Sequence, residues 1–274
     1  MSKIMEKFSL NGRTALVTGG AGLLGRQFTR TLGEAGAKVV VADLDQEAAK
    51  EQAQALVRDG IDALAVAVDV TDPESVSAMV KTAVEQFGSL DVIVNSAALD
   101  PKFDKENLGL QTGNAFETYP LETWKQAIDV NLTGMFLTCQ AAARQMLKQE
   151  AGVIINVCSV YGLAGPDQRL YEQPDGTQFF KPAYYPVSKA GVCGLTRYLA
   201  AYYAGKKIRV NALTPGGVFN DHDAGFTEKY TAKTMLGRMA ELDELNGALL
   251  FLASDASSYM TGSNLVVDGG YTAW

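Results

Sequence analysis

The sequence predicts an α/β fold in which helices cover both faces of a parallel, doubly wound sheet. Two observations support this prediction: the expected strands are apolar throughout, and they alternate along the chain with segments of helical periodicity. Strands without polar alternation are buried on both faces, as in parallel sheets, and right-handed crossovers then wind the sheet in both directions. The chain contains no repeat or linker, so we expect residues 1–274 to form one domain.

Seven strands are expected, most of them separated by helices. The strands are predicted at residues 13–18, 38–43, 63–70, 91–95, 153–159, 208–213 and 265–268. The helices are predicted from the first glycine-rich turn through residue 35, and at 46–58, 73–87, 121–149, 183–204 and 241–253. Pro73 and Pro186 fall in first turns, where proline is tolerated. Residues 99–120 read as irregular.

Composition limits the functions that are expected. A net charge of −7 and a pI near 4.9 argue against nucleic-acid and anionic-membrane partners. No apolar run of 18 residues and no signal core occur, so we expect a cytoplasmic protein. Three cysteines fit a reducing compartment and make a disulfide or zinc framework improbable. The single histidine, His222, is expected to be a solvated loop residue, and no metal site is expected.

A glycine-rich turn follows the first strand, with the spacing Gly19-x-x-Gly22-x-x-Gly25. Glycines here allow a tight turn and close approach of the backbone to a pyrophosphate, at the N-terminus of the next helix. A plain tight turn would use the same residues. The strand before the turn, the helix after it and an acidic residue at the end of the second strand favour a dinucleotide site.

The acidic residue is Asp43, which lies 18 residues beyond Gly25. At this offset a carboxylate accepts hydrogen bonds from the adenosine ribose hydroxyls and repels a 2′-phosphate. No Arg or Lys flanks Asp43, so the sequence predicts NAD rather than NADP. The alternative role for Asp43 is a helix N-cap, although Asp45 fills that role as well. Asp69 is a candidate for the adenine amino group, or else a strand-end cap.

The chemistry is expected at Tyr185 and Lys189, with Ser159 upstream. Residues four apart on a helix are neighbours, so the Lys189 ammonium lies beside the Tyr185 phenol and favours the phenolate. Such a tyrosine exchanges a proton with an alcohol or carbonyl. Tyr and Lys at this spacing on a solvated helix are common, so the pair is informative only together with the rest of the chain.

Taken together, these motifs resemble the short-chain dehydrogenase/reductase family, single-domain branch, along nearly the whole chain. The matching motifs are Thr18-Gly19…Gly25, Asp43, Asp69-Val70, Asn95-Ser96-Ala97-Ala98, Asn131, Ser159, Tyr185…Lys189, Pro215-Gly216-Gly217 and Val267-Asp268-Gly269-Gly270. The resemblance implies a Rossmann-type domain with a seven-stranded parallel sheet and a nicotinamide cofactor. It implies catalytic roles for Asn131, Ser159, Tyr185 and Lys189. Tyr184 competes for the role of the base, but only Tyr185 has a lysine four residues later.

The resemblance also implies a set of cofactor contacts around the strand ends. They are Gly19, Gly22, Leu23, Leu24, Gly25, Asp43, Leu44, Asp69, Val70, Asn95, Ala97, Tyr185, Lys189, Pro215, Gly216 and Val218. Residues 217–237 are expected to form a lid over cofactor and substrate, with an ordinary mobile loop as the alternative.

Three features depart from the family pattern. The first glycines follow a spacing more typical of the family's longer, sugar-nucleotide-modifying branch. The motif after the fourth strand reads Asn-Ser-Ala-Ala instead of Asn-Asn-Ala-Gly. Ser159 and Tyr185 are 26 residues apart, about twice the usual gap, and the excess is a polar insertion at about 165–181. The insertion either shapes substrate choice or is a neutral surface loop.

The implied reaction is reversible oxidation of a secondary alcohol to a ketone with NAD. Tyr185 would take the hydroxyl proton, Ser159 would hold that oxygen, and Lys189 would bind the nicotinamide ribose. Asn131 would position Lys189 through water. The polar insertion and NAD preference favour a sugar or polyol as the small-molecule substrate.

Two other functions are weighed against a sugar or polyol dehydrogenase. A 3-oxoacyl ketoreductase is disfavoured by Asp43 and by the acidic surface. A non-catalytic dinucleotide-sensing regulator is disfavoured by the intact Ser159, Tyr185 and Lys189. The resemblance also implies a homotetramer or dimer. The apolar face Val192, Leu195 and Leu199 suits an interface or the core, and Trp274 suits an oligomer contact or packing on the substrate loop.

Overall fold

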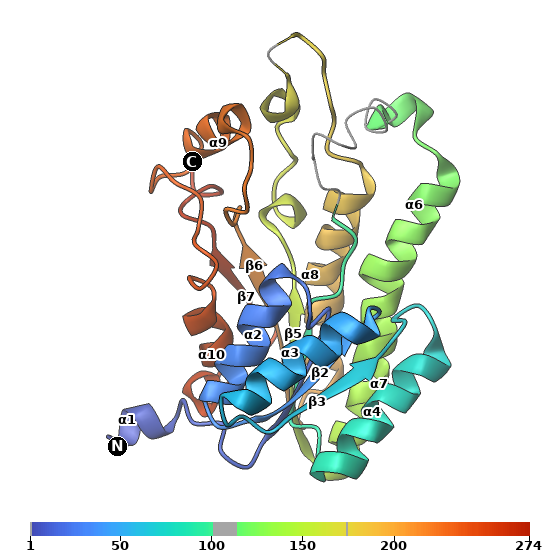
Figure 1. The fold of residues 1–274 in the computed structure, drawn as a ribbon, viewed down its shortest axis with the longest axis vertical. Coiled ribbons are helices and arrows are strands. Elements are labelled where there is room, and N and C mark those ends of the chain that lie inside the picture. The colour runs from blue at the N-terminus through green and yellow to red at the C-terminus, as the bar shows by residue number, and fades with distance from the viewer. Residues whose placement is uncertain (1, 101–113, 174) are drawn as a thin grey trace.

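The computed structural model describes residues 2–100, 114–173 and 175–274, and at its centre is a seven-stranded parallel sheet (Figure 1). The strand order is β3-β2-β1-β4-β5-β6-β7. The strands are β1 (Thr14–Thr18), β2 (Lys38–Asp43), β3 (Ala63–Ala67), β4 (Val92–Asn95), β5 (Ala151–Val157), β6 (Lys207–Pro215) and β7 (Asn264–Val267). Every neighbouring pair is parallel, which confirms the predicted doubly wound sheet. The direction of winding reverses between β1 and β4.

Helices cover both faces of the sheet. α2 (Leu23–Glu34), α3 (Gln46–Arg58) and α10 (Asn246–Ala253) pack on one face, and α4 (Pro73–Phe87), α7 (Gly134–Gln149) and α8 (Tyr184–Tyr202) on the other (Figure 1). Successive strand residues point to opposite faces, so Leu16 joins one core and Val17 the other. This is why apolar runs without alternation predict the sheet correctly. Short helices α1 (Lys3–Glu6), α6 (Leu121–Ile128) and α9 (Ala224–Thr231) lie outside these layers.

Helix ends are set by local chemistry. Asp45 caps α3 by accepting hydrogen bonds from the backbone N–H groups of Glu47 and Ala48. Asp72 caps α4 in the same way, and α4 ends at Gly88, whose φ of 91° favours glycine. These caps confirm the predicted bounds 46–58 and 73–87.

The predicted helix at 121–149 is interrupted. α6 and α7 are joined by a π-helical turn, Asp129–Thr133, which contains the buried Asn131. Turns of this kind insert one extra residue into a helix and often mark functional sites. Hydrophobic periodicity does not reveal such a turn, because the helix axis continues through it.

Three other predictions of elements need correction. The strand predicted at 63–70 ends at Ala67, because Asp69 and Thr71 form a turn. The helix predicted at 241–253 begins only at Asn246. The insertion contains a 3-10 helix, Gln168–Tyr171, and an antiparallel bridge between Glu172 and Gln178. The part of the irregular stretch at 101–113 lies outside the described residues.

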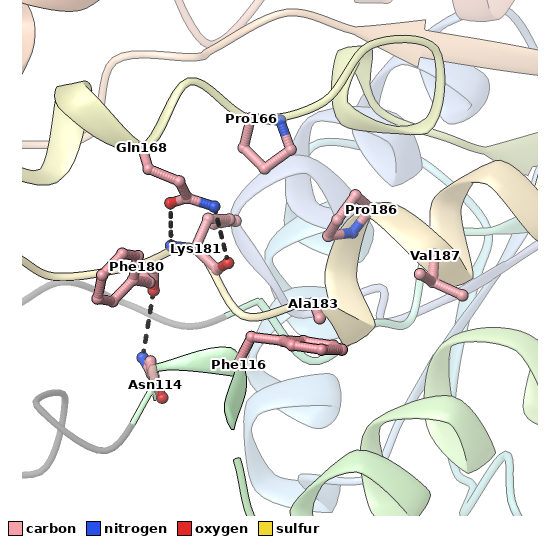
Figure 2. A pocket seen from close by; sticks show the side chains of 9 residues that line it. All are labelled: Asn114, Phe116, Pro166, Gln168, Phe180, Lys181, Ala183, Pro186 and Val187. Atoms are coloured by element: carbon pink, nitrogen blue, oxygen red, sulfur yellow. Dashed lines mark hydrogen bonds between the residues drawn. The ribbon is translucent and has the colours of Figure 1, made fainter. Parts of the chain in front are cut away.

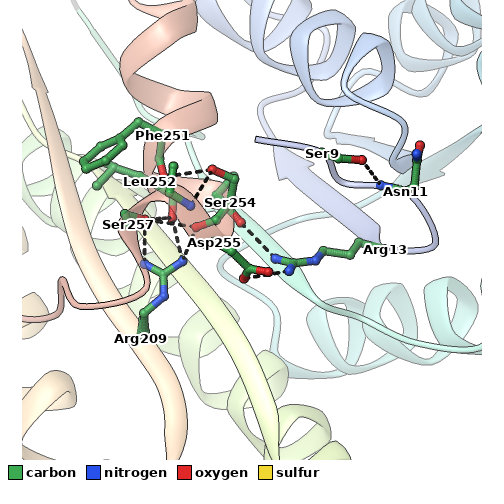
Figure 3. Close-up of polar contacts among 11 residues, drawn as sticks. Ser9, Asn11, Arg13, Arg209, Phe251, Leu252, Ser254, Asp255 and Ser257 are labelled. Atoms are coloured by element: carbon green, nitrogen blue, oxygen red, sulfur yellow. Dashed lines mark hydrogen bonds and ion pairs between the residues drawn. The ribbon is translucent and has the colours of Figure 1, made fainter. Parts of the chain in front are cut away.

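Two arginines tie the end of α10 to the sheet (Figure 3). Arg209, on β6, donates to the carbonyls of Leu252 and Ser254, each over 3.0 Å. Arg13, next to β1, forms a 2.7 Å ion pair with Asp255. The last carbonyls of a helix lack partners within it, and here Arg209 and the Ser257 hydroxyl together donate to the carbonyls of Leu252 and Ser254. Within the described ranges no helix is both long and apolar enough to cross a membrane.

Candidate active site

The predicted site residues meet at one edge of the sheet. Asp43, Asn95 and Pro215 end β2, β4 and β6, and Gly19 directly follows β1. Asp69 and Ser159 lie two residues beyond the ends of β3 and β5. The carboxyl ends of parallel strands share one edge, so the sheet gathers residues that are far apart in sequence. Figure 1 shows α9 and the insertion projecting at this same end.

The glycine-rich turn fits a phosphate group. A Cβ on Gly25 would lie 2.0 Å from the carbonyl oxygen of Gly19, and one on Gly19 would lie 2.9 Å from Ala97 Cα. Gly22 is the N-cap of α2 and offers no capping side chain. The first-turn N–H groups, including those of Leu23 and Leu24, therefore have no side-chain cap and suit an anion.

Asp43 holds the glycine-rich turn by hydrogen bonds to backbone N–H groups. Its Oδ2 accepts a hydrogen bond from Ala21 N–H over 3.0 Å, and its Oδ1 accepts one from Asp45 N–H over 3.1 Å. Asp45, and not Asp43, caps α3. Leu44 beside it is 74% exposed and is available to a ligand.

Two of the remaining predicted cofactor contacts, Asp69 and Asn95, use their side chains for hydrogen bonds within the protein. Asp69 accepts hydrogen bonds from the N–H and the hydroxyl of Thr71, which lower the pKa of its carboxyl group, so the strand-end cap is observed. Asn95 directs its side chain into the interior, where it donates to Asn156 Oδ1 over 2.8 Å. Only the backbone of Asn95 is left for a ligand. Val70 is buried.

Three other predicted cofactor-binding residues, Ala97, Gly216 and Val218, are held at the strand ends by hydrogen bonds of their backbone. Ala97 N–H donates to Thr18 Oγ1, which joins the turn after β4 to β1. Beyond Pro215, the Gly216 N–H donates to the carbonyl of Val267, and Val218 forms a parallel bridge with Ala240. These contacts hold both turns at the edge of the sheet.

Ser159, Tyr185 and Lys189 form a buried cluster beside β5. Each is less than 10% exposed, and Lys189 Nζ donates to the carbonyl of Val157 over 3.0 Å. The Lys189 ammonium lies 5.8 Å from the centroid of the Tyr185 ring. Burial and the charge of Asp100 raise the pKa of Tyr185, while a hydrogen bond with the Ser159 side chain lowers it less. Burial also lowers the pKa of Lys189.

Asn131 positions the Tyr185 helix through contacts that the sequence does not reveal. Its Nδ2 donates to the carbonyl of Leu99 and to Ser188 Oγ, and its Oδ1 accepts from Leu99 N–H over 2.7 Å. Ser188 directly precedes Lys189 on α8. Asn131 therefore joins α8 to the loop after β4, instead of making a described contact with Lys189 itself.

The two adjacent tyrosines have different surroundings. Tyr184 packs against Tyr119, with ring centroids 6.2 Å apart. Tyr185 faces the side chains of Ser159, Lys189 and Tyr161. The geometry favours Tyr185 as the base, in line with the spacing argument.

Comparison with known proteins agrees with this geometry. The family model described as enoyl-(acyl carrier protein) reductase matches residues 20–272. A trans-4-hydroxycyclohexanecarboxylate dehydrogenase from Sinomonas cyclohexanicum is 38% identical over 100% of this chain and 97% of its own length. A crystal structure of a short-chain type dehydrogenase/reductase from Mycobacterium marinum superposes with a TM-score of 0.86 at 35% identity, covering 100% of both chains. The chain belongs to the short-chain dehydrogenase/reductase family.

A second solved structure of this family shows ligands. It is a gluconate 5-dehydrogenase from Burkholderia cenocepacia in complex with NADP and tartrate. It has a TM-score of 0.86 and 31% identity, and the alignment covers 98% of this chain and 99% of that one.

The insertion of this short-chain dehydrogenase/reductase packs against the predicted lid. Tyr171 of the insertion contacts Phe226 of α9, with centroids 5.6 Å apart, and Tyr230 of α9 stacks on Tyr271 at 4.9 Å. We call these four residues the aromatic roof. Tyr271 also contacts Tyr161, which contacts Tyr185. The insertion is therefore joined to the predicted lid and, through Tyr161, to Tyr185.

The structure adds contacts that the sequence did not predict for two residues near the predicted lid, His222 and Trp274. His222 is exposed, as expected, but stacks on Phe226 at 5.2 Å. Trp274 is 78% exposed, and its Nε1 donates to the carbonyl of Lys233 over 2.7 Å. The C-terminal aromatic side chain thus contacts the lid region without being buried by it.

Sequence reasoning missed two charged residues of the site, Lys181 and Asp100. Lys181 Nζ lies 4.2 Å from the centroid of the Tyr185 ring and donates to Asp100 Oδ1 over 2.5 Å. The available signal was spacing, because Lys181 and Lys189 each lie four residues from Tyr185. Lys181 precedes the first turn of α8, so helical periodicity does not include it.

The cysteines are free and buried. The sulfur atoms of Cys158 and Cys193 lie 3.4 Å apart, between β5 and α8, and Cys139 is buried elsewhere in the core. Across the described parts of the chain, no group of three His, Cys, Asp or Glu side chains is arranged to hold a metal ion.

Proposed function

We propose that this enzyme interconverts a secondary alcohol and a ketone, with NAD as its cofactor. The observation that carries the proposal is the buried cluster at Tyr185, where the Ser159 hydroxyl bonds the phenol and Lys189 lies beside the ring. A buried tyrosine with a cation and a hydroxyl donor is suited to exchanging one proton with a bound alcohol.

The residues divide the work of the reaction. Tyr185 takes the proton of the alcohol hydroxyl, and Ser159 holds that oxygen by a hydrogen bond. Lys189 favours the phenolate by its charge and, in this proposal, binds the ribose next to the nicotinamide. Asn131 keeps α8 in position through Ser188. NAD, when bound, supplies the hydride acceptor, while the protein supplies orientation and electrostatics.

Asp43 supports NAD as the cofactor. Its carboxylate lies at the glycine-rich turn, where a 2′-phosphate would meet a like charge. Arg26 lies at the same turn, but its guanidinium donates to the Ala21 carbonyl and pairs with Glu51. The solved structure of the gluconate 5-dehydrogenase contains NADP, so the proposal of NAD for this chain rests on Asp43.

We infer that the substrate is a small hydroxylated compound: a sugar, a polyol or a hydroxy acid. The support is the insertion, which brings polar groups to the Tyr185 cluster, and the names of relatives that act on hydroxycyclohexanecarboxylate and gluconate. A 3-oxoacyl ketoreductase remains the second candidate enzyme. Its support is the description of the matching family model, which names a reductase of substrates bound to acyl carrier protein. The net charge of −7 disfavours docking of an acidic carrier.

We also infer a cytoplasmic homo-oligomer, a tetramer or a dimer. Tyr198 and Tyr202 of α8 support an oligomer, because they stack on one another while 63% and 67% exposed. Val192 is buried in the core and so is unavailable to an interface.

The test is cofactor reduction by the purified protein, with NAD and NADP in parallel, across polyols, sugars, hydroxy acids and hydroxyacyl thioesters. Reduction of NAD with a small hydroxylated compound supports the proposal. Turnover confined to hydroxyacyl thioesters would instead favour the ketoreductase, and NAD binding without turnover would favour the regulator.

A further inference from the structure

The catalytic tyrosine has a second lysine beside it. The Lys181 ammonium lies 4.2 Å from the centroid of the Tyr185 ring and 5.9 Å from that of Tyr161. Only 8% of Lys181 is exposed. A cation over an aromatic face gains about 0.5–2 kcal/mol, whereas burying an ammonium costs several kcal/mol. The cation–π energy of the two rings is smaller than the cost of burying the Lys181 ammonium. A negatively charged partner is therefore expected at this ammonium.

The insertion holds the backbone of Lys181 at two points. Lys181 N–H donates to Gln168 Oε1 over 2.9 Å, and Gln168 Nε2 donates to the Lys181 carbonyl over 3.4 Å (Figure 2). Asn114 Nδ2 donates to the adjacent carbonyl of Phe180 over 3.4 Å. Beside these contacts lies a cavity of about 260 Å³ that Lys181 lines together with Pro186 of α8. Lys181 is therefore a fixed part of the site and not a mobile surface lysine.

A carboxylate of the protein itself meets the Lys181 ammonium. Asp100, on the loop after β4, pairs with Lys181 over 2.5 Å, yet the Asp100 side chain is 57% exposed and that of Lys181 only 8%. The charge of Asp100 raises the pKa of both Tyr185 and Lys189, so this carboxylate acts within the catalytic cluster. An exposed carboxylate returns to water at little cost, while the buried ammonium does not.

We propose that Lys181 recognises a carboxylate on the substrate, which takes the place of Asp100 at the ammonium. This rests on the proposed function, because it requires an alcohol bound at Tyr185. It narrows the substrate to a hydroxy acid whose carboxylate is a few bonds away from the reacting carbinol. The exchange keeps Lys181 paired throughout, so the buried charge is never left without a partner.

The experiment compares an acid with its neutral analogue. The value of kcat/KM for NAD reduction is measured with 4-hydroxycyclohexanecarboxylate and with its carboxamide, for the wild type, Lys181→Met, Lys181→Arg and Asp100→Asn. Lys81→Met is the matched control, because Lys81 is an exposed lysine that pairs with Glu85. The acid-to-amide ratio isolates carboxylate recognition, since any effect of Lys181 on Tyr185 applies to both substrates.

We expect the wild type to favour the acid, and Lys181→Met to lower the acid-to-amide ratio by about 30- to 100-fold, mostly through KM. Lys181→Arg should restore most of the ratio, Asp100→Asn should raise it, and Lys81→Met should leave it unchanged. Competitive inhibition by cyclohexanecarboxylate, against whichever alcohol is oxidised, gives a second readout, and Lys181→Met should weaken it by a similar factor.

Equal losses on acid and amide in Lys181→Met would overturn the inference, and so would a wild type that prefers the amide. A wild type that oxidises a polyol and is not inhibited by cyclohexanecarboxylate would overturn it while leaving the proposed function intact. NAD binding without oxidation of any alcohol would overturn both.

Discussion

At the scale of single residues, the site depends on what surrounds Tyr185. Lys189 approaches the ring from its own helix, Lys181 from the insertion, and Asp100 from the loop after β4. A cation beside a phenol favours the phenolate, whereas burial and the charge of Asp100 raise the pKa of Tyr185. We therefore expect the balance of these charges, and not the Tyr-Lys motif alone, to set the pH dependence of the reaction.

Asp100→Asn tests this balance. In the proposed mechanism alcohol oxidation needs the Tyr185 phenolate, so we expect its rate to rise as the pH passes the pKa of that phenol. Because the charge of Asp100 raises the pKa of Tyr185, its removal should lower that pKa. The rising limb of the kcat/KM profile should therefore move to lower pH. Tyr161, Tyr171 and Cys158 also face the cluster and are unchanged by this substitution.

The measurement is a pH profile with a neutral alcohol, which keeps carboxylate recognition out of the result. Asp223→Asn is the control, because Asp223 caps α9 and is exposed. A profile that stays in place or moves to higher pH in Asp100→Asn would show that Asp100 does not act on Tyr185.

Asp43→Ser tests the cofactor. The serine hydroxyl keeps an acceptor at the glycine-rich turn but removes the charge that repels a 2′-phosphate. We expect the ratio of kcat/KM for NAD to that for NADP to fall about 100-fold, which corresponds to about 2.7 kcal/mol. Asp43→Glu should retain the preference for NAD. If the wild type already prefers NADP, the argument from Asp43 is wrong.

At the scale of elements, the insertion and α9 act as one unit. The aromatic roof joins them, and Lys229 Nζ donates across to the carbonyl of Glu172 over 2.7 Å. The two segments predicted separately, at about 165–181 and 217–237, therefore come together over the Tyr185 cluster. Their polar, glycine-bearing sequences conceal this, because the buried aromatic residues are scattered and follow no helical or strand period.

The opposite end of the molecule depends on Arg209. Arg209→Met removes the guanidinium donors to the Leu252 and Ser254 carbonyls, which then share the Ser257 hydroxyl as their donor at the end of α10. The free energy of unfolding should fall by about 2–3 kcal/mol. Denaturant unfolding measures this change. Arg144→Met, which removes only an exposed contact with Gln140, should change it by less than about 0.5 kcal/mol. Equal stability of the two variants would contradict this role for Arg209.

The sequence predicts the positions of strands and helices well because these positions follow from local patterns. Apolar strands specify burial on both faces, and caps such as Asp45 and Asp72 specify helix starts. It also locates the residues at the strand ends, since parallel connection places them at one edge. The sequence does not predict which side chains pair with residues far away in the chain. The contacts of Asn131 with Leu99 and of Lys181 with Asp100 join residues 32 and 81 positions apart.

At the scale of the whole molecule, the sheet and the helices packed on its two faces make a frame, and the candidate site residues gather at its carboxyl edge. Turns after β1, β4, β5 and β6 meet there, and the insertion and α9 project beyond them (Figure 1). Such a frame lets loops vary while the Tyr185 cluster keeps its geometry. Relatives of this chain are named for different substrates, and Lys181 lies in the insertion, outside the frame of strands and covering helices.

The most direct test of the account is Tyr185→Phe, assayed for both NAD reduction and NAD binding. The phenyl ring keeps the packing against Tyr161 but carries no proton-transfer group. We expect kcat with the best alcohol to fall by about 1,000-fold or more, while the dissociation constant for NAD changes by less than about threefold. Turnover that persists in Tyr185→Phe would contradict the proposed mechanism.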